Sequence, residues 1–198
     1  MPALVGVITC PKNYERVRAI KETWLPKATV EVEFFNGQRL SCFDDYEHLS
    51  QKTAALCVWA LEHGHDRILK LDDDAYINWR AFKIIEADYA GIRKPGDYAS
   101  GGAYWLSRRA MEIVARYGID DTAEDRGVGK LLAQHGIPLT DIPYILGGAG
   151  VALDYGCPCP KCKDKSGPIW EYFPEAAVIT QLGPDQMRAC HRFYTENG

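Results

Sequence analysis

The sequence has few of the features that mark membrane, nucleic-acid-binding or repeat proteins. No apolar run approaches the roughly 20 residues of a membrane-spanning helix. The formal net charge is −4, with no basic tract of the kind that binds nucleic acid. No internal repeat or low-complexity linker occurs before about residue 155. What remains is a chain of 198 residues, 46% hydrophobic, which suits one domain with a sizeable core at the usual ~100–200 residues per domain.

We also expect no export signal. The N-terminal run MPALVGVI has no positively charged region and is typical of a first strand. The seven cysteines are an odd number in a chain without such a signal, which favours reduced thiols or a metal site over disulfides. We therefore expect an intracellular protein with no membrane partner.

Short apolar strands alternate with helices along most of the chain. Apolar or alternating runs predict strands over residues 4–9, 30–36, 67–71, 98–106 and 139–145. Helical spacing, caps and breakers predict helices over residues 15–24, 49–64, 78–90, 107–118 and 122–136. This alternation predicts an α/β fold with a mostly parallel sheet flanked by helices, in which ligands bind beyond the carboxyl ends of the strands.

The composition changes at Gly147, where a glycine-rich run, a cysteine- and proline-rich run and a mixed tail follow one another. We interpret residues 1–146 as the α/β core. Residues 147–198 are then a small Cys-rich C-terminal subregion packed on that core, and the chain forms a single domain.

Three cysteines of this subregion lie in a C-x-C-x-x-C arrangement: Cys157, Cys159 and Cys162. Thiolates at this spacing suit a structural Zn²⁺, which takes four ligands in a tetrahedron, and Cys190 or His191 is available as the fourth. Unligated reduced thiols are the alternative, and a disulfide is disfavoured inside a reducing cell. The other cysteines, expected to fill the core, are Cys10, Cys42 and Cys57.

Asp72, Asp73 and Asp74 follow the predicted strand 67–71, at the edge where ligands bind. Three adjacent carboxylates repel one another unless a cation neutralises them, and Mg²⁺ or Mn²⁺ also bridges substrate phosphates. In an extended segment, Asp72 and Asp74 point to one side and Asp73 to the other. One pair can then serve the metal while the remaining carboxylate binds a sugar or ribose hydroxyl. A solvated acidic turn and a metal-dependent phosphoesterase or nuclease are the alternatives.

Five short blocks along residues 4–135 carry a family resemblance. They are Arg16 with AIKETW at 19–24, DYEHLSQKT at 45–53, KLDDDAYIN at 70–78, YASGGAYWLS at 98–107 and EDRGVG at 124–129. In this order they resemble the β-1,3-galactosyltransferase and fringe-like family of glycosyltransferases. The resemblance implies a GT-A fold, a UDP-sugar donor, a Mn²⁺ or Mg²⁺ cofactor and inversion at the anomeric carbon. A short member without a membrane anchor is expected in the cytoplasm of a bacterium or a virus-infected host cell.

The resemblance also implies roles for individual residues. The donor-binding residues would be Thr9, Arg16, Lys52, Asp72, Asp73, Gly101 and Gly102. Asp74, together with Asp72, would ligate the metal, which neutralises the leaving diphosphate. On the residues alone, Arg16 and Lys52 are equally typical of helix-surface charges in water, and the two glycines of a simple bulge.

Inverting transfer needs a carboxylate that takes the proton of the acceptor hydroxyl. The resemblance places this catalytic base at Asp125, and Glu124 beside it is the second candidate. Residues 122–125, TAED, also match a capping box, in which Asp125 would merely cap a helix. We favour Asp125 as the base.

The C-terminal region departs from the family, which usually places a metal-binding histidine shortly before a P-E-x-M segment. Here PDQM at 184–187 follows TQL at 180–182, so the histidine is missing. Gln181 is a weaker oxygen ligand for the same metal. Water and His191 are the other substitutes.

The sequence leaves the sugar and the acceptor open. The acceptor is a glycan, a protein hydroxyl or, least favoured, a modified nucleobase. A non-catalytic nucleotide-sugar or glycan-binding relative is the alternative function, and a metal-dependent phosphoesterase is a less favoured one.

Overall fold

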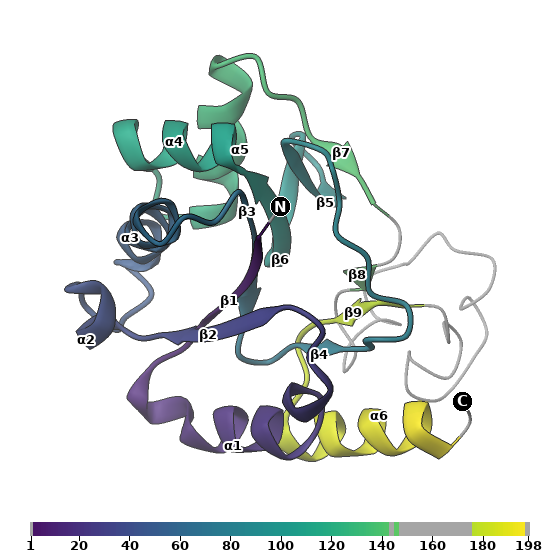
Figure 1. Ribbon diagram of the computed structural model, residues 1–198. Helices are drawn as coiled ribbons and strands as arrows, with labels where there is room; N and C mark the ends of the chain where they lie inside the picture. Colours follow the sequence, from purple (N-terminus) through teal and green to yellow (C-terminus); the bar gives the residue numbers. More distant parts are fainter. Residues whose placement is uncertain (1, 143–144, 147–175, 197–198) are drawn as a thin grey trace.

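The structure is a computed structural model and describes residues 2–142, 145–146 and 176–196. Its central strands are β1 (Ala3–Ile8), β2 (Glu31–Phe35), β3 (Arg67–Asp72), β5 (Tyr89–Lys94), β6 (Tyr98–Ser107) and β7 (Thr140–Asp141). They form one six-stranded sheet in the order β2-β1-β3-β6-β5-β7 (Figure 1). The pairs β1–β2, β1–β3 and β5–β7 are parallel, whereas β6 runs antiparallel to β3 and β5. The predicted α/β fold with a mostly parallel sheet is confirmed.

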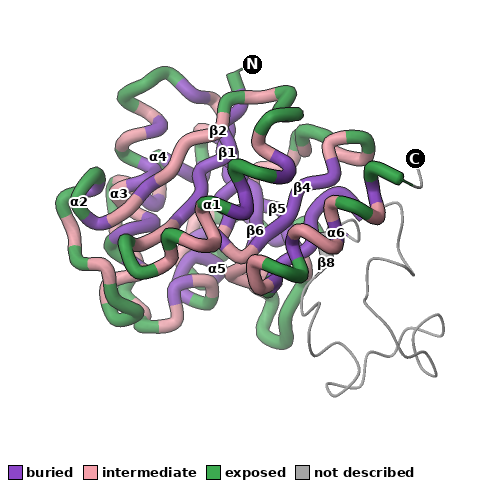
Figure 2. The backbone as a smooth tube through the Cα atoms, turned by 90° about the horizontal axis from the view of Figure 1, so that it is seen from below, coloured by how far each residue is buried: buried purple, intermediate pink, exposed green. Residues whose placement is uncertain are grey.

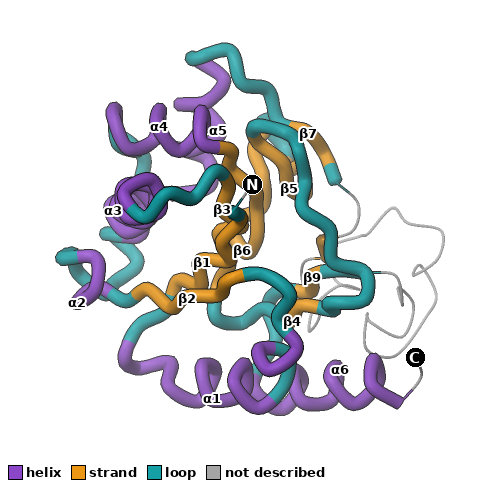
Figure 3. Tube along the Cα trace, viewed as in Figure 1, coloured by secondary structure: helices purple, strands orange, loops and turns teal. Residues whose placement is uncertain are grey.

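Helices flank this sheet on both faces (Figures 1 and 3). One face carries α1 (Tyr14–Glu22) and α6 (Pro184–Glu196), which pack against each other. The other face carries α3 (Leu49–Glu62), α4 (Arg108–Tyr117) and α5 (Glu124–Gln134). Short helices at chain turns are η1 (Pro11–Asn13), η2 (Leu25–Lys27) and α2 (Gly37–Leu40). None of the helices in the described ranges is both long and apolar enough to span a membrane.

Strand β1 is apolar on both faces, as a strand covered on both sides must be. In β1, Val5 and Val7 belong to the core cluster beside α1 and α6, whereas Leu4 and Ile8 belong to the cluster under α3, α4 and α5. Figure 2 shows the buried residues along the central strands and the exposed ones on loops and outer helical turns. The polar residues that end these strands therefore stand out at the sheet edge.

A smaller sheet joins distant parts of the chain. β4 (Tyr76–Ile77) pairs antiparallel with β9 (Val178–Ile179), and β9 pairs parallel with β8 (Ile145–Leu146). The predicted strand 139–145 is thus two short strands, β7 and β8, in different sheets. α6 follows β9 and sends Met187 and Cys190 into the core cluster beside α1. The described part of the C-terminal subregion packs on the core, and the boundary at residue 147 stays a prediction.

The predicted helix 78–90 is wrong. Residues between β4 and β5 form neither helix nor strand. Asn78 Oδ1 accepts from the amide of Arg80 at 3.3 Å, as a helix cap would, but only a turn follows, and the side-chain amide of Asn78 donates to the carbonyl of Ala176 at 3.2 Å. Arg67 donates to the carbonyls of Glu86 and Ala87, which a helix would use internally. Partners far away in the sequence replace the helical hydrogen bonds that local spacing predicted.

Candidate functional site

The carboxyl ends of β1 and β3 meet at one edge of the sheet, because these neighbouring strands are parallel. Thr9 follows β1, and Asp72 ends β3. Residues 72–74 form a tight turn, in which the amide of Ala75 donates to the carbonyl of Asp72 at 3.2 Å. We name these three residues the acidic turn. The extended geometry predicted for them is wrong, and each carboxylate has its own partners.

Asp73 is the buried member of the acidic turn. Its Oδ2 accepts from Thr9 Oγ1 at 2.7 Å and Asn13 Nδ2 at 2.9 Å, and its Oδ1 accepts from Arg16 Nη1 at 3.0 Å. Arg16 Nη1 also lies 3.8 Å from Asp74 Oδ2. Burial lowers the pKa of Arg16. The hydrogen bond to Asp73 and the charges of the three aspartates raise it by more, so the pKa of Arg16 lies above its ordinary value. Arg16 is therefore a partner of the acidic turn, and Asn13 is a partner that the sequence analysis does not identify.

Lys70 is a completely buried cation behind the acidic turn. Its Nζ donates to Asp72 Oδ1 and to the carbonyl of Gly101, both at 2.6 Å, and lies 3.8 Å from Glu124 Oε2. Burial lowers the pKa of Lys70. The charges of Asp72 and Glu124 raise it by more, so the pKa of Lys70 lies above its ordinary value. Lys70 has no role among the residues predicted from the sequence, although a lysine between leucines of a buried strand signals a buried partner.

Asp74 faces the C-terminal segment. Its Oδ1 accepts from the backbone amide of Gln181 at 3.3 Å, and its carbonyl accepts from the amide of Leu182 at 2.8 Å. Gln181 has a φ of 64°, a left-handed conformation that glutamine rarely adopts. Burial and the charge of Asp72 raise the pKa of Asp74 against the lowering effect of Arg16. The structure brings Gln181 beside the acidic turn, and its role as a weak metal ligand stays a prediction.

Lys52 is a second buried cation at this edge. Although it belongs to α3, only 3% of its surface is exposed. Its Nζ donates to the carbonyl of Thr9 at 3.1 Å and to Asp44 Oδ1 at 2.5 Å. Asp44 also accepts from the amide of Gly37 at 2.7 Å. The alternative of a helix-surface charge in water is therefore wrong for Lys52, which ties α3 to the end of β1.

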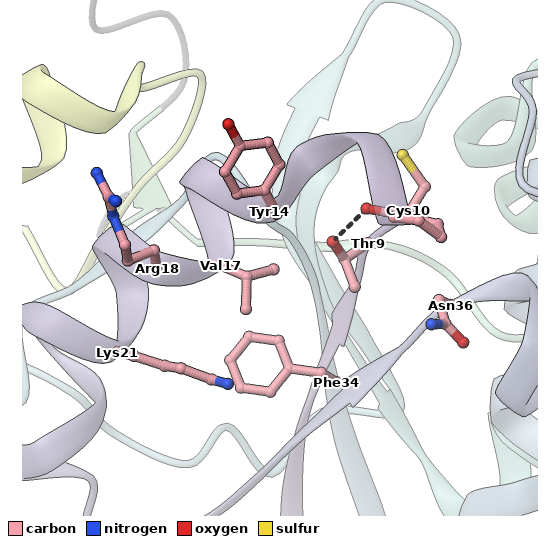
Figure 4. Close-up of a pocket in the computed structure, with 9 residues that line it drawn as sticks. Thr9, Cys10, Tyr14, Val17, Arg18, Lys21, Phe34 and Asn36 are labelled. Atoms are coloured by element: carbon pink, nitrogen blue, oxygen red, sulfur yellow. Dashed lines mark hydrogen bonds between the residues drawn. The ribbon is translucent and has the colours of Figure 1, made fainter.

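A pocket of about 470 Å³ opens beside Thr9, between α1 and the carboxyl ends of β1 and β2 (Figure 4). Tyr14 from α1 and Phe34 from β2 contribute aromatic rings to its wall, and Asn36 contributes an amide. Thr9 lines the pocket and also donates to Asp73. The pocket and the acidic turn are therefore adjacent.

β6 bulges before it pairs with β3. The register between β5 and β6 shifts so that residues 100–103 lie opposite Ile92 alone. Gly101 and Gly102 lie in this bulge, so the bulge considered for them as an alternative is present. The amide of Gly101 donates to Asp125 Oδ2 at 3.1 Å. The bulge thereby contacts the start of α5, and the contact of both glycines with a donor stays a prediction.

Glu124, the first residue of α5, is buried. Its carboxylate accepts from the hydroxyl of Tyr104 and lies beside Lys70. Burial raises the pKa of Glu124 by more than Lys70 and Tyr104 lower it. A carboxylate held in this way is closed off from an incoming substrate.

Asp125 is half-buried at the same helix end. Its carboxylate accepts from the backbone amides of Gly101 at 3.1 Å and Arg126 at 2.8 Å. The helix is capped at Ala123 without a side-chain hydrogen bond, so the capping-box interpretation is wrong. Of the two adjacent acids, Asp125 is the one with access to solvent.

The predicted zinc ligands are described only in part. Outside the described residues lie Cys157, Cys159 and Cys162. Of the candidates for the fourth ligand, Cys190 is buried in the core, and His191 Nδ1 lies 3.1 Å from the hydroxyl of Tyr76. No group of three or more His, Cys, Asp or Glu residues within the described ranges is arranged to hold a metal ion. The zinc site stays a prediction.

The remaining cysteines have different surroundings. Cys57 fills the core as predicted, and Cys42 is half-buried against the same cluster. Cys10 instead lines the pocket beside Thr9, so its predicted place in the core is wrong.

No protein-family profile and no curated protein sequence matches the chain. Among solved structures, it is similar to a crystal structure of a glycosyltransferase involved in the glycosylation of the major capsid of PBCV-1. That similarity has a TM-score of 0.60 and 12% identity, and covers 96% of this chain and 99% of that chain. The structure of A197 from STIV also matches, with a TM-score of 0.49 and 12% identity over 72% of this chain and 82% of that chain. The first similarity shows that the chain has a glycosyltransferase-like fold, and the fringe-like family is not confirmed.

Proposed function

We propose that this protein is a glycosyltransferase that moves a sugar from a nucleotide-sugar, with UDP as the favoured nucleotide, to an acceptor hydroxyl with inversion. One observation carries the proposal. The acidic turn is linked through Thr9 to a pocket of nucleoside size and through Lys70 and Gly101 to the carboxylate of Asp125. The similarity in fold to a glycosyltransferase supports it.

The charges of the site fit a divalent cation, Mn²⁺ or Mg²⁺. Within the described residues, the site groups six acidic and three basic side chains, Asp44, Asp72, Asp73, Asp74, Glu124 and Asp125 against Arg16, Lys52 and Lys70. Asp74 is poorly compensated, since burial and Asp72 raise its pKa. Such cations are bound by one or two carboxylates plus substrate phosphates, which Asp72 and Asp74 can supply with Gln181 beside them. When bound, the metal would neutralise the charge of the leaving diphosphate.

The nucleotide of the donor would occupy the pocket beside Thr9. A volume of about 470 Å³ lies in the ~300–1,000 Å³ range of small-molecule sites. The rings of Tyr14 and Phe34 offer faces on which a base can stack. Arg16, partly exposed, would attract the diphosphate. Lys52 and Asp73 are buried and bonded, so we expect them to hold Thr9 and Arg16 in place.

Asp125 would carry the proton step. Its carboxylate takes the proton of the acceptor hydroxyl as that oxygen attacks the anomeric carbon opposite the diphosphate. The bond from the anomeric carbon to the diphosphate breaks, and its electron pair leaves with the nucleotide. The backbone amides of Gly101 and Arg126 orient the carboxylate for this task. The acceptor classes and the cytoplasmic location stay as the sequence predicts them.

A screen of UDP- and GDP-sugars for Mn²⁺-dependent donor hydrolysis tests the proposal. We expect release of UDP from at least one UDP-sugar, and loss of that release when EDTA removes the metal. Tight UDP-sugar binding without turnover would instead indicate the non-catalytic relative, which the glutamine at position 181 favours. Hydrolysis of simple phosphate esters in preference to sugar nucleotides would indicate a phosphoesterase.

A further inference from the structure

The backbone of Gly101, which lies in the β6 bulge, forms hydrogen bonds with two side chains on different elements. Its amide donates to Asp125 Oδ2 at 3.1 Å, and its carbonyl accepts from Lys70 Nζ at 2.6 Å. Lys70 is completely buried and is also bound to Asp72 at 2.6 Å, which makes it a fixed anchor. The position of the Gly101 backbone is therefore set from inside the molecule, and the Asp125 carboxylate is placed against that backbone.

Because Gly101 has no side chain, the Asp125 carboxylate can lie close to its backbone. A Cβ at Gly101 would lie 3.2 Å from Oδ2, 3.3 Å from Cβ and 3.4 Å from Cγ of Asp125. The two shorter contacts are tighter than most real Cβ contacts, so Asp125 would have to move by a few tenths of an ångström. Its other described hydrogen bond, from the amide of Arg126, comes from its own helix and does not fix its distance from the bulge.

Gly102 borders a different element. A Cβ there would lie 2.9 Å from Cβ and 3.0 Å from Oγ1 and Cγ2 of Thr180. Thr180 precedes Gln181, whose amide donates to Asp74 Oδ1 at 3.3 Å. The two adjacent glycines therefore border two different parts of the site, the start of α5 and the segment that binds the acidic turn.

We infer that Gly101 is a positioning residue for the catalytic base. Its neighbour Gly102 leaves room for Thr180, and so for the segment that binds the acidic turn. This inference rests on the proposed function and replaces the contact with the donor sugar that the sequence predicts for Gly101. A base must lie within hydrogen-bond reach of the proton it takes. A misplacement of about 1 Å can cost on the order of 10²-fold in rate.

The test compares Gly101→Ala with its matched control Gly102→Ala, using the UDP-sugar that the wild type turns over. Gly101→Ala should lower kcat at least ~10-fold and leave the affinity for UDP and Mn²⁺ unchanged. Gly102→Ala should push Thr180 away and weaken that affinity about 10-fold or more, the usual effect of disturbing residues around a metal ligand. Circular dichroism establishes that each variant is folded.

A double-mutant cycle with Asp125→Asn shows whether Gly101 acts through Asp125. In the Asp125→Asn background, Gly101→Ala should have no further effect on kcat. The inference is overturned by additive losses, by a normal kcat in Gly101→Ala, by equal losses of UDP affinity in both glycine variants, or by failure of Gly101→Ala to fold. If the wild type does not turn over a sugar nucleotide, the proposed function and the inference are overturned together. If the wild type is active and the variants give one of the four results just named, only the inference is overturned.

Discussion

Asp125 and Glu124 are adjacent carboxylates in opposite environments, and the amide variant of each separates their roles. Asp125→Asn keeps one acceptor oxygen for one of the two backbone hydrogen bonds, from Gly101 or from Arg126, but it cannot take up a proton. We expect transfer at least ~100-fold slower, as for the loss of a general base, with unchanged affinity for UDP. Steady-state kinetics and calorimetric UDP titration measure the two effects.

Glu124→Gln is the matched control for Asp125→Asn. Because Glu124 is buried against Tyr104 and Lys70, the amide should lower the melting temperature by disturbing these contacts. Donor binding should persist in the folded fraction. A stable, inactive Glu124→Gln beside an active Asp125→Asn would exchange the two roles.

We expect Asp74 to lower the stability of the metal-free protein at neutral pH. Burial and Asp72 raise its pKa, so the folded chain binds a proton there more tightly than the unfolded chain. The contribution of this group to stability is therefore greatest at low pH and falls as the pH rises from the ordinary aspartate value of 3.8 through the raised pKa. At neutral pH, Asp74→Asn should melt at a higher temperature than the metal-free wild type.

The same Asp74→Asn variant should lose stabilisation by Mn²⁺ with UDP, since ligands stabilise only the state that binds them. Thermal unfolding with and without Mn²⁺, repeated at neutral pH and below 3.8, measures both effects. The stability difference should vanish at the lower pH. An Asn variant that melts below the wild type at neutral pH and is still stabilised by Mn²⁺ would contradict the assignment of Asp74.

The role of a single residue can be predicted from the sequence when the residues it acts with are adjacent to it in the chain. The acidic turn is visible as three consecutive aspartates. Asn13 is not, because its bond to Asp73 joins residues 60 positions apart. The anchoring role of Lys70 depends on the carbonyl of Gly101, 31 positions away. Every residue has a backbone carbonyl, so the sequence does not indicate which one accepts from Lys70.

At the scale of elements, the segment between α1 and η2 holds the residue that follows the acidic turn. The indole of Trp24 donates to the carbonyl of Ala75 at 3.0 Å. Trp24→Phe keeps a ring in the core but leaves that buried carbonyl without this donor, which costs about 1–3 kcal/mol. We expect lower stability in urea unfolding and weaker Mn²⁺-dependent UDP binding.

Trp79→Phe is the control, since the Trp79 indole donates to the carbonyl of Trp24 at 2.7 Å and not to the turn. It should lose stability while UDP affinity is unchanged. Equal losses of affinity in both variants would mean that the Trp24 bond does not position the acidic turn.

Elements that follow local rules are the predictable ones. Ser107 caps α4 by accepting from the amide of Ala110, Gly118 ends the same helix, and Gly64 follows α3 with a φ of 80°. The segment 78–90 follows tertiary partners instead, which override local propensity. The predicted helix 78–90 overlaps the start of β5, so neither β5 nor the tight turn at Gly96 and Asp97 that reverses the chain into β6 is predicted.

At the scale of the whole molecule, we propose that a structural zinc ion bound by Cys157, Cys159 and Cys162 stabilises the C-terminal subregion. Elemental analysis of protein purified without added metal should find about one zinc per chain. Cys159→Ser should lower the melting temperature and impair activity indirectly, because the segment that binds Asp74 belongs to the same subregion. Cys10→Ser, in the pocket beside Thr9, is the control and should keep its zinc. Zinc well below one per chain, with all seven thiols titratable in the native protein, would rule the site out.

The contact between Gln181 and Asp74 joins residues 107 positions apart, and this separation sets an order in time. Closing so long a loop is entropically costly before its contacts form, whereas β5 and β6 pair across a short turn. The sheet should therefore form early, and the acidic turn should receive its last partners late. On the ribosome, the chain carries all three aspartates long before the segment that binds Asp74 has been made. We therefore expect the sheet of a newly made molecule to form before the proposed active site is complete.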